Sequence, residues 1–346
     1  MAETKKNSKS AFDSSLPFER RIIELEAQLQ KAQSDGERRM LEAEIEREQE
    51  TVFSNLTPWQ RIQLARHPLR PRMLDYVPRV FEDFVELHGD RAIGDDLAVV
   101  AGLGRFQSET VVVVGQQKGC TTDEKVRRSF GMPHPHGYRK ALRMFHMAER
   151  LHLPILNFVD TPAAHPGVDA ERYGQGPIIA QNLRECAGLN TPIFVVVLGE
   201  GGSGGALAIA FGDWVTMFEH AIYVVCPPES CAEILWRDKE KKELAAAAMK
   251  ITAKDLLNLG AVDAILPEPG GGAHRHPDRA AAVLSDEIQR FMEGCKQGAW
   301  TPERRQKRFR QLGMWTVAPT GPASAPPLRR AANASTDGDG ANREND

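Results

Sequence analysis

Residues 198–213 (LGEGGSGGALAIAFGD) contain the residue types and spacings that could most directly do chemistry in this chain. Gly199, Gly201 and Gly204 match the G-x-G-x-x-G spacing of loops that hold a dinucleotide pyrophosphate at a helix N-terminus. Gly201, Ser203 and Gly205 match the G-x-S-x-G spacing of a nucleophile elbow, in which a serine hydroxyl attacks an acyl carbon. A third possibility is that the backbone amides of the stretch bind the ligand themselves.

A dinucleotide site needs more than these glycines. It requires a crossover helix and then a strand that ends in an acidic residue about 20 residues further on. Glu219 has that offset, near the end of the apolar segment 214–220 (WVTMFEH). The next apolar segment, 221–227 (AIYVVCP), follows directly and leaves no room for a crossover helix. The sequence therefore argues against a dinucleotide.

A serine hydrolase is the better supported alternative, because Ser203 lies between a predicted strand and a predicted helix. Such an enzyme needs a histidine and an acid later in the chain. His220, His274, His276 and Asp263 are available. A serine hydrolase that uses Ser203 therefore stays open as an alternative.

Glycine fills four of the five positions from 201 to 205, which is more than an elbow needs. Glycine lets a ligand approach the main chain, and a helix N-terminus offers free N–H groups and a positive dipole end. We expect the amides of Gly202, Gly204 and Gly205 to form an oxyanion hole, where loss of one donor costs about 3–4 kcal/mol. Bulk at Gly204 or Gly205 is therefore predicted to be severe. Ser203 is expected to be the N-cap of the helix that follows, and Gly201 and Ser203 are expected to lie beside the bound ligand.

The elements that position this stretch alternate between strands and helices. The β-branched runs TVVVVG, PILNFVD and PIFVVVLG are each followed by a helical pattern. This alternation predicts parallel strands buried on both faces, with the ligand at their carboxyl ends. Residues 97–119 predict a β-hairpin, residues 70–89 a helix that ends at Gly89, residues 261–269 a last strand and residues 276–298 an amphipathic helix.

The flanking segments differ in composition from the main domain, which we place at residues 57–298. Residues 18–56 predict a helical hairpin, because Ile22, Leu25, Leu29, Leu41 and Ile45 recur at helical spacing. This apolar stripe is compatible with packing on the chain's own body and with a partner interface. Residues 1–17 are expected to be disordered, and residues 299–346 to form a basic helix and a disordered tail. The run 304–310 (RRQKRFR) is expected to be a solvated helix face rather than a nucleic-acid contact.

Composition excludes several classes of protein. The 346 residues carry a net charge of −3, with 41 % hydrophobic and 26 % charged residues, so no global field recruits nucleic acid. The sequence contains neither a secretory h-region nor an apolar run of about 18 residues. The five scattered cysteines favour reduced thiols and a cytoplasmic location.

Two pairs of histidines could suggest a metal site. They are His134 with His136 and His274 with His276. Their proline-interrupted spacing and the lack of neighbouring thiolates argue against one, and the chain contains no C-x-x-C pair. We therefore expect no metal in this chain.

Four long motifs occur in order: GQQKGCTTDEKVRRSFGMPHPHGYRKALRMF, FVDTPAAHPGVDAERYGQG, LGEGGSGGALAIAFGD and CPPESCAEILWRD. Together with AVDAILPEPGGGAHR, they resemble the alpha-subunit family of the bacterial and plastid-type acetyl-coenzyme A carboxylase carboxyltransferase, over residues 18–298. The resemblance implies an α/β fold of the ClpP/crotonase-like class, a spiral of ββα units with an N-terminal helical segment. It implies transfer of a carboxyl group from carboxybiotin to acetyl-coenzyme A, which gives malonyl-coenzyme A, the first committed step of fatty-acid synthesis.

The resemblance also implies partners and cofactors. A beta subunit would complete an alpha2beta2 heterotetramer, bind the acetyl-coenzyme A and carry the family's zinc. The biotin carboxyl carrier protein would supply carboxybiotin, and ATP would be used only by the biotin carboxylase component. Neither a membrane nor nucleic acid is expected as a partner. A scaffold subunit without catalytic residues, whose helical hairpin holds a partner, is the remaining alternative.

Site residues follow from the matched motifs. Gly202, Gly204 and Gly205 would donate to the ureido oxygen of biotin, and the liberated biotin nitrogen would accept the acetyl proton, so no side-chain base is required. The basic loop after the first parallel strand could bind a carboxylate or coenzyme A phosphates, or could be a solvated face. The expected substrate-binding residues are Asp160, Thr161, Pro162, Gly167, Lys118, Arg127 and Arg128.

This chain also departs from the family pattern. Gln116 stands where the family usually has histidine, in its G-H-Q-K-G motif. Ala163, His165 and Asp169 replace Gly, Tyr and Gly in the D-T-P-G-A-Y-P-G-V-G motif. The shape and charge of the loop expected to border biotin therefore differ here.

Overall fold

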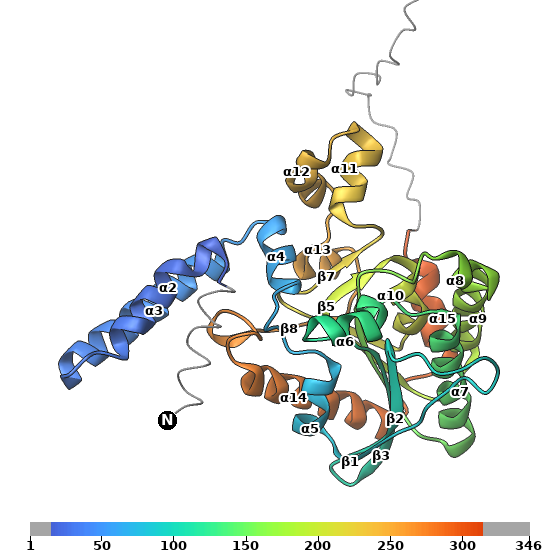
Figure 1. The fold of residues 1–346 in the computed structure, drawn as a ribbon. Helices are drawn as coiled ribbons and strands as arrows, with labels where there is room; N and C mark the ends of the chain where they lie inside the picture. The colour runs from blue at the N-terminus through green and yellow to red at the C-terminus, as the bar shows by residue number, and fades with distance from the viewer. Residues whose placement is uncertain (1–14, 314–346) are drawn as a thin grey trace, which may run out of the picture. The chain divides into compact units, whose positions relative to one another are not determined.

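In the computed structural model, which describes residues 15–313, an eight-stranded sheet has the order β1-β2-β3-β4-β5-β6-β8, and β7 pairs with β5 (Figure 1). All the strands expected after residue 96 are present. The strands are β1 (Glu82–Glu86), β2 (Val99–Phe106), β3 (Glu109–Gln116), β4 (Ile155–Thr161), β5 (Ile193–Gly202), β6 (Trp214–Phe218), β7 (Ile222–Val224) and β8 (Ala264–Leu266).

The strand pairing explains the apolar runs. β2 and β3 form the expected antiparallel hairpin, and β3, β4, β5 and β6 are parallel. Val112, Val113 and Val114 of β3 are fully buried, as a strand covered on both faces requires. β5 pairs with β6 near its start and with β7 at its end, where Glu200 is opposite Ile222. The end of β5 is thereby held on a second side, next to the glycine-rich stretch.

Helices surround this sheet and connect its strands. α7 packs on β2 and β3, α10 packs on β4 and β5, and α14 packs on α5 and β8. In Figure 1, α5 and α14 lie to the left of β2 and β3, and α7 and α9 lie to the right. None of the helices in the described range combines the length and the apolar character that crossing a bilayer requires. The α-helices of the body are α4 (Pro58–Ala65), α5 (Met73–Val80), α6 (Thr122–Arg127), α7 (Pro135–Leu151), α8 (Val168–Arg172), α9 (Gln175–Gly188), α10 (Ser203–Ala210), α11 (Pro228–Trp236), α12 (Lys242–Ala248), α13 (Ala253–Asn258), α14 (Pro277–Lys296) and α15 (Pro302–Gln311). The short 3₁₀ turns are η1 (Pro17–Glu19), η2 (Ser129–Gly131), η3 (Lys239–Lys241) and η4 (Pro269–Gly271).

One predicted helix is wrong over its second half. α5 ends at Val80, and Phe81 is extended, so residues expected to be helical form the edge strand β1. Pro78 lies inside the last turn of α5, where it removes one backbone donor. Pairing with β2 then satisfies the backbone of the following residues.

The expected helical hairpin consists of α2 (Arg20–Leu29) and α3 (Asp35–Ser54), and Ile22, Leu25 and Ile45 are buried in one cluster. The hairpin meets the body at a buried polar cluster, which we call the hairpin joint. In this joint His274 Nε2 lies 2.8 Å from Glu19 Oε1, and Arg275 Nη1 lies 3.6 Å from the same oxygen. Arg275 also pairs with Glu26. The hairpin therefore packs on the chain's own body, which leaves a partner contact on its other surfaces as a separate prediction.

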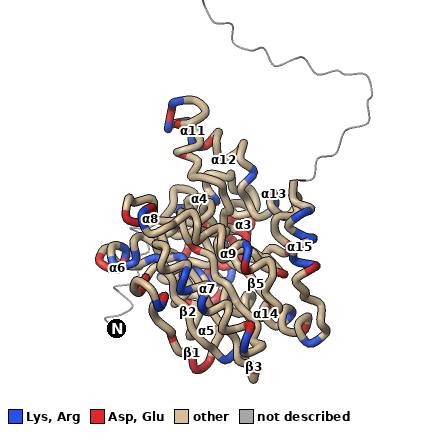
Figure 2. The backbone as a smooth tube through the Cα atoms, turned by 90° about the vertical axis from the view of Figure 1, so that its right-hand side faces the viewer, with Lys and Arg blue, Asp and Glu red and all other residues tan. Residues whose placement is uncertain are grey.

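The basic helix near the C-terminus has the expected solvated face, where Arg304, Lys307 and Arg310 are exposed, but it also has a buried contact that was not expected. α15 is rich in Lys and Arg (Figure 2), yet Arg305 is 1 % exposed. Its guanidinium binds Asp213 at 2.7 and 3.0 Å and donates to the carbonyls of Leu189 and Thr191. Buried acceptors that need donors explain this, because an unpaired carboxylate is costly to bury. The compact unit accordingly extends to Leu312. The predicted start of a separate segment at residue 299 stays a prediction. The disorder predicted for residues 1–17 and for the tail also stays a prediction, since residues 1–14 and 314–346 lie outside the described range.

Candidate active site

The carboxyl ends of β3, β4 and β5 bring three charged side chains together. Lys118 follows β3, Asp160 lies in β4 and Glu200 lies in β5. Lys118 Nζ is 2.8 Å from Asp160 Oδ1 and 2.6 Å from Glu200 Oε2. We call these three residues the strand-end triad. The parallel register of the strands puts the three positions side by side at the carboxyl ends of the strands, where open α/β sheets bind ligands.

Asp160 and Glu200 of the triad are buried and Lys118 is half-buried, and the charges of Lys118 and Glu200 support one another. Burial alone would raise the pKa of Glu200, but the nearby charges of Lys118 and Arg66 lower it to about 2. Burial would lower the pKa of Lys118, but Asp160 and Glu200 raise it above its usual value. Arg66 Nε lies 2.6 Å from Glu200 Oε1. At neutral pH Glu200 is therefore a carboxylate and Lys118 an ammonium, and neither is poised to exchange a proton.

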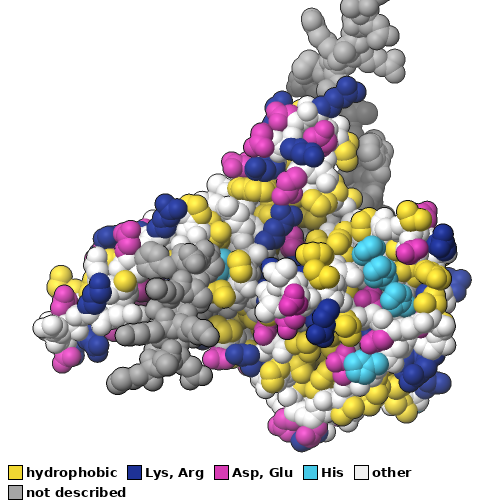
Figure 3. Space-filling model, viewed as in Figure 1, with side chains coloured by type: hydrophobic (Ala, Val, Ile, Leu, Met, Phe, Trp, Pro, Cys, Tyr) yellow, Lys and Arg dark blue, Asp and Glu magenta, His cyan; other side chains and the backbone are white. Residues whose placement is uncertain are grey.

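A pocket of about 310 Å³ opens beside the triad. Pro162 and Phe130 form part of its wall. Basic side chains outnumber acidic ones around it, which favours an anionic ligand such as a carboxylate or a phosphate. On the face seen in Figure 3, by contrast, charges of both signs are mixed with hydrophobic side chains. The basic residues that line the pocket are Arg66, Arg70, Arg72, Lys118 and Lys125, and the acidic ones are Asp160 and Glu200.

The glycine-rich stretch lies against the loop that follows β4. A Cβ atom at Gly202 would lie 2.0 Å from the Pro162 carbonyl oxygen, and one at Gly205 would lie 2.3 Å from the Ala164 amide nitrogen. These two glycines therefore allow two backbone segments to touch. A Cβ atom at Gly204 would meet nothing closer than 3.7 Å. A severe effect of added bulk was predicted from the sequence for both Gly204 and Gly205. The structure supports it for Gly205 and leaves room for a methyl group at Gly204.

The first turn of α10 presents free donors. Among the described residues, no hydrogen bond from the backbone amides of Gly204 or Gly205 is present outside regular helix and strand pairing. Ser203 directly follows the Gly202–Val224 pair of the β5–β7 ladder. Free amides are expected over the first turn of a helix, where they point along the positive end of its dipole. Gly204 is half-buried and Ser203 is exposed, so a ligand can reach this turn. The arrangement can stabilise negative charge on an oxygen atom.

Ser203 is neither an N-cap nor part of a triad in the described residues. The N-cap of α10 is Gly202, and no side chain caps the helix, so the expected capping role was wrong. Ser203 has a positive φ of 53°, a strained backbone of the kind that elbows use. Two of the histidines proposed to serve it are engaged elsewhere, since His220 Nδ1 lies 2.8 Å from Arg61 and His274 pairs with Glu19. The third, His276, lines a hollow beside Glu19 and Glu26 of the hairpin joint. Within residues 15–313, the geometry therefore supports no base for the hydrolase alternative.

The other expected substrate-binding residues divide into two groups. Thr161 closes a turn, since its hydroxyl donates to the Ala163 carbonyl at 2.7 Å. The Gly167 amide donates to His165 Nδ1 at 3.1 Å. These two residues shape the loop that carries Pro162 into the pocket wall.

The two arginines of the basic loop lie away from the pocket wall. Arg128 Nη1 donates to the Leu97 carbonyl at 2.6 Å, and Arg127 is exposed on α6. Only Lys118 and Lys125 of the expected basic loop line the pocket. Lys118 has two carboxylate partners, so an anion there would share it with Asp160 and Glu200.

The loop with the family departures carries a stack of imidazoles. The rings of His134 and His165 stack with their centroids 3.9 Å apart, and His136 lies 5.3 Å from His134. Burial lowers the pKa of His134 and of His165, so both favour the neutral form. The sequence noted His165 only as a departure, and the stack was not foreseen because His134 lies 31 positions earlier.

In the described range, one group of side chains has the spacing of metal ligands, and it lies at the hairpin joint. The ligand atoms of Glu19, His67 and His274 lie within 4.8 Å of one another. Both imidazoles already take part in hydrogen bonds, because the Leu69 amide donates to His67 Nδ1 and His274 Nε2 faces Glu19. These hydrogen bonds account for the short distances between the three side chains without an ion. The expectation of no metal stays a prediction.

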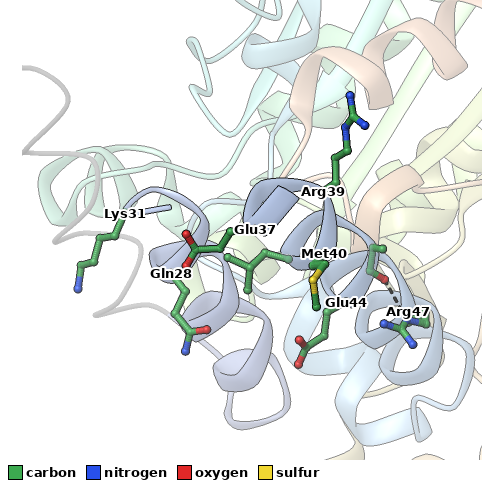
Figure 4. Close-up of a pocket in the computed structure, with 9 residues that line it drawn as sticks. Gln28, Lys31, Glu37, Arg39, Met40, Glu44 and Arg47 are labelled. Atoms are coloured by element: carbon green, nitrogen blue, oxygen red, sulfur yellow. Dashed lines mark hydrogen bonds between the residues drawn. The ribbon is translucent and has the colours of Figure 1, made fainter. Parts of the chain in front are cut away.

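A larger hollow of about 840 Å³ lies between α2 and α3 (Figure 4). Its side chains include Lys31, Glu37, Arg39 and Glu44, which point in different directions and do not converge on one point. It contains no buried charged group of the kind found in the strand-end triad. The smaller pocket at the strand ends is therefore the better candidate for chemistry.

Comparisons with known proteins identify the family of the chain. Residues 15–313 match the family model described as acetyl co-enzyme A carboxylase carboxyltransferase-like. The chain is 50 % identical over 315 residues to the acetyl-coenzyme A carboxylase carboxyl transferase subunit alpha of Thermosynechococcus vestitus, which covers 88 % of this chain and 97 % of that protein. It is 54 % identical over 270 residues to the protein of that name from Geobacter sulfurreducens, with 78 % and 85 % covered.

Solved structures confirm the expected fold. The crystal structure of transcarboxylase 12S with hydrolysed methylmalonyl-coenzyme A superposes with a TM-score of 0.53 at 17 % identity, over 73 % of this chain and 44 % of that chain. A second structure of the same enzyme gives a TM-score of 0.52. The chain has the α/β fold of the crotonase class that its motifs implied.

Proposed function

The chain belongs to the family of acetyl-coenzyme A carboxylase carboxyltransferase alpha subunits, and from this membership we propose that the start of α10 and the strand-end triad form its carboxybiotin site. The protein is a carboxyltransferase that passes the carboxyl group of carboxybiotin to acetyl-coenzyme A and yields malonyl-coenzyme A for fatty-acid synthesis. The observation that carries the site assignment is the set of unpaired amides at the start of α10, beside a buried ion cluster.

The amides suit the charge that the transfer creates. When the carboxyl group leaves, negative charge develops on the ureido oxygen of biotin. Preorganised N–H donors stabilise such an oxygen, and they act most strongly where water is excluded. We assign this role to the amides of Gly204 and Gly205, together with that of Gly202 at the end of β5. Gly201 and Ser203 would lie beside the bound biotin.

The side chains of the site bind and orient rather than transfer protons. Lys118 and Glu200 keep their charges, and the biotin nitrogen can accept the proton that leaves the acetyl methyl group. We propose that Lys118 and Asp160 fix the strand ends and that Pro162, Thr161 and Gly167 shape the wall of the pocket. Its basic excess favours the carboxylate in transit. Arg127 and Arg128 lie outside the pocket wall and are assigned to attraction of the coenzyme A phosphates.

The partners complete this proposal. We propose a beta subunit that holds acetyl-coenzyme A and the zinc ion, in an alpha2beta2 heterotetramer in the cytoplasm. The biotin carboxyl carrier protein would deliver carboxybiotin, which biotin carboxylase forms with ATP. In this arrangement the alpha chain itself needs neither ATP nor a metal.

The test is co-expression of the chain with candidate beta subunits, followed by the malonyl-coenzyme A-dependent carboxylation of free biotin. Gly204→Pro removes one backbone N–H in the first turn of α10, where proline is tolerated. Gly204→Ala keeps that N–H and adds only a methyl group with space around it. We expect kcat of the proline variant to be about 10²- to 10³-fold lower than that of the alanine variant.

Assembly with the beta subunit, measured by mass, is the control for folding in both variants. Equal kcat values in the two assembled variants would overturn the role of the Gly204 amide. Serine-reactive labelling that disappears in Ser203→Ala, together with loss of transfer, would instead favour the hydrolase alternative. Assembly without any transfer activity would favour the scaffold alternative.

A further inference from the structure

The carbonyl oxygen of Gly205 receives two hydrogen bonds from side chains of other elements. Gln116 Nε2, at the end of β3, donates to it at 2.7 Å. Tyr138 Oη, in α7, donates to it at 3.0 Å. A carbonyl oxygen has two lone pairs, so these side chains engage both. The peptide that follows Gly205 is therefore oriented from outside its own helix.

Gln116 has no freedom to turn its amide group. It is fully buried, and its Oε1 accepts the backbone N–H of Asp160 at 3.1 Å while its Nε2 donates to Gly205. Reversing the amide would place its NH2 group against the Asp160 N–H and its oxygen against the Gly205 carbonyl. Both hydrogen bonds between these buried groups would then be lost, at the cost of unsatisfied polar groups. One side chain thus joins β3, the end of β4 and the start of α10.

Tyr138 supplies a second fixed donor. Its side chain is fully buried, and this burial raises the pKa of its hydroxyl well above the usual value, so it stays protonated. The Asn182 side chain donates to the Tyr138 carbonyl at 3.2 Å and ties α9 to α7. The hydroxyl is therefore held by two packed helices.

External anchoring matters here because the segment it holds is intrinsically loose. Gly204 and Gly205 lack a Cβ atom and lose more conformational entropy on folding than other residues. A displacement of about 1 Å at a reacting group can cost about 100-fold in rate. We propose that Gln116 and Tyr138 are positioning residues that aim the Gly204 and Gly205 amides at the ligand oxygen. This inference rests on the proposed function of those amides.

A positioning role and a merely structural role predict different kinetics. Loss of a structural hydrogen bond lowers stability, and the molecules that remain folded keep their kcat. Loss of a positioning bond lowers kcat of the folded assembly, while KM for biotin and for malonyl-coenzyme A changes little. The ratio of these effects separates the two roles.

The experiment measures kcat and KM for the biotin carboxylation reaction in the assembled enzyme with its beta subunit. Gln116→Met keeps the volume and removes both hydrogen bonds, and Tyr138→Phe removes one. We expect kcat to fall about 100-fold in the first and about 10-fold in the second, with KM changed by less than about 3-fold. Gln116→His, which restores the residue usual in the family and a ring N–H donor, is expected to recover most of the loss.

Asn157→Leu is the matched control. Asn157 is a buried amide in β4 whose Nδ2 donates to the Ile209 carbonyl at 2.8 Å, near the far end of α10. We expect this variant to lose stability and to retain kcat. A wild-type kcat in assembled Gln116→Met, or a loss that Asn157→Leu shares, would overturn the inference. If Gly204→Pro is inactive and Gln116→Met is fully active, only this inference fails, whereas full activity of Gly204→Pro removes the proposed function as well.

Discussion

The strand-end triad and the hairpin joint are both buried clusters of charged side chains, and they are built differently. The triad joins residues at the ends of adjacent parallel strands, so the sheet register fixes its geometry. The joint pairs Glu19 with His274, which are 255 positions apart and meet only because the hairpin docks on the body. Charges within the sheet therefore depend on the core, whereas charges at the joint depend on one docking contact.

This difference bears on function as well as on stability. The triad lies beside the pocket and the glycine helix, so a change there affects the proposed carboxybiotin site. The joint lies at the base of α2, and it meets the pocket through His67, whose ring packs on that of His274. We expect substitutions in the triad to affect the whole domain and those in the joint to affect the hairpin first.

The largest effect is expected from Lys118→Met. This variant leaves Asp160 and Glu200 buried without their shared cation, and loss of one partner of a buried ion pair costs about 3–5 kcal/mol. Urea denaturation followed by circular dichroism measures the free energy of unfolding. Lys125→Met is the matched control, since Lys125 lines the same pocket and forms no ion pair with a described residue. A loss below about 1 kcal/mol for Lys118→Met would show that the triad is not integral to the core.

Much of this region could be predicted from sequence because it depends on local order. The apolar runs fixed the strands, and the residues after each run had to lie at one edge of the sheet. That logic placed Lys118 and the glycine stretch at this edge, whereas Asp160 was expected there from the resemblance to the family motif. It could not foresee that Lys118 is neutralised, since Glu200 stands inside a glycine-rich run and looked like part of the loop.

Other features could not be predicted, because they depend on contacts between distant segments. The basic run of α15 has the composition of a solvated helix, and nothing local marks Arg305 as the partner of buried Asp213. From the sequence, Gln116 stood out only as a departure from a family pattern. Its two partners depend on where the Gly205 carbonyl points, which only the packed helix decides.

The second prediction concerns acid, and it again separates the triad from uncharged parts of the core. The pKa of Glu200 lies at about 2 in the folded chain, against 4.5 for the free side chain. Because the folded value is the lower one, the carboxylate stabilises the fold above about pH 4.5, and this contribution is lost as pH falls toward 2. Unfolding of wild type and Glu200→Gln across this range is expected to show stabilities that converge in acid. Parallel curves would contradict the pairing of Glu200 with Lys118 and Arg66.

A smaller and more local effect is expected from Glu19→Gln in the joint. Glutamine can still accept a hydrogen bond from His274 but loses its charge toward Arg275, which we expect to cost about 1–3 kcal/mol. Hydrogen exchange of the α2 amides should increase while that of the β4 and β5 amides stays unchanged. Glu24→Gln on the exposed face of α2 is the control. Equal acceleration in the sheet would mean that the joint is part of the core, and the contrast with the triad would fail.

The smallest effect is expected from Arg21→Ala, which tests whether burial is what distinguishes the joint from the rest of the hairpin. Arg21 Nη2 lies 2.7 Å from Glu44 Oε1 between α2 and α3, between the 2.6 and 2.8 Å of the two pairs in the triad, but both side chains are about half exposed (51 % and 45 %). Water screens such a pair, and ordering two long side chains offsets most of its attraction, so pairs of this kind contribute about 0–1 kcal/mol. We expect Arg21→Ala to lower the free energy of unfolding, measured by urea denaturation, by less than about 0.5 kcal/mol relative to wild type. This difference should disappear in high salt. A cost equal to that of Glu19→Gln would show that proximity of charges, rather than their burial, decides the strength of ion pairs in this hairpin.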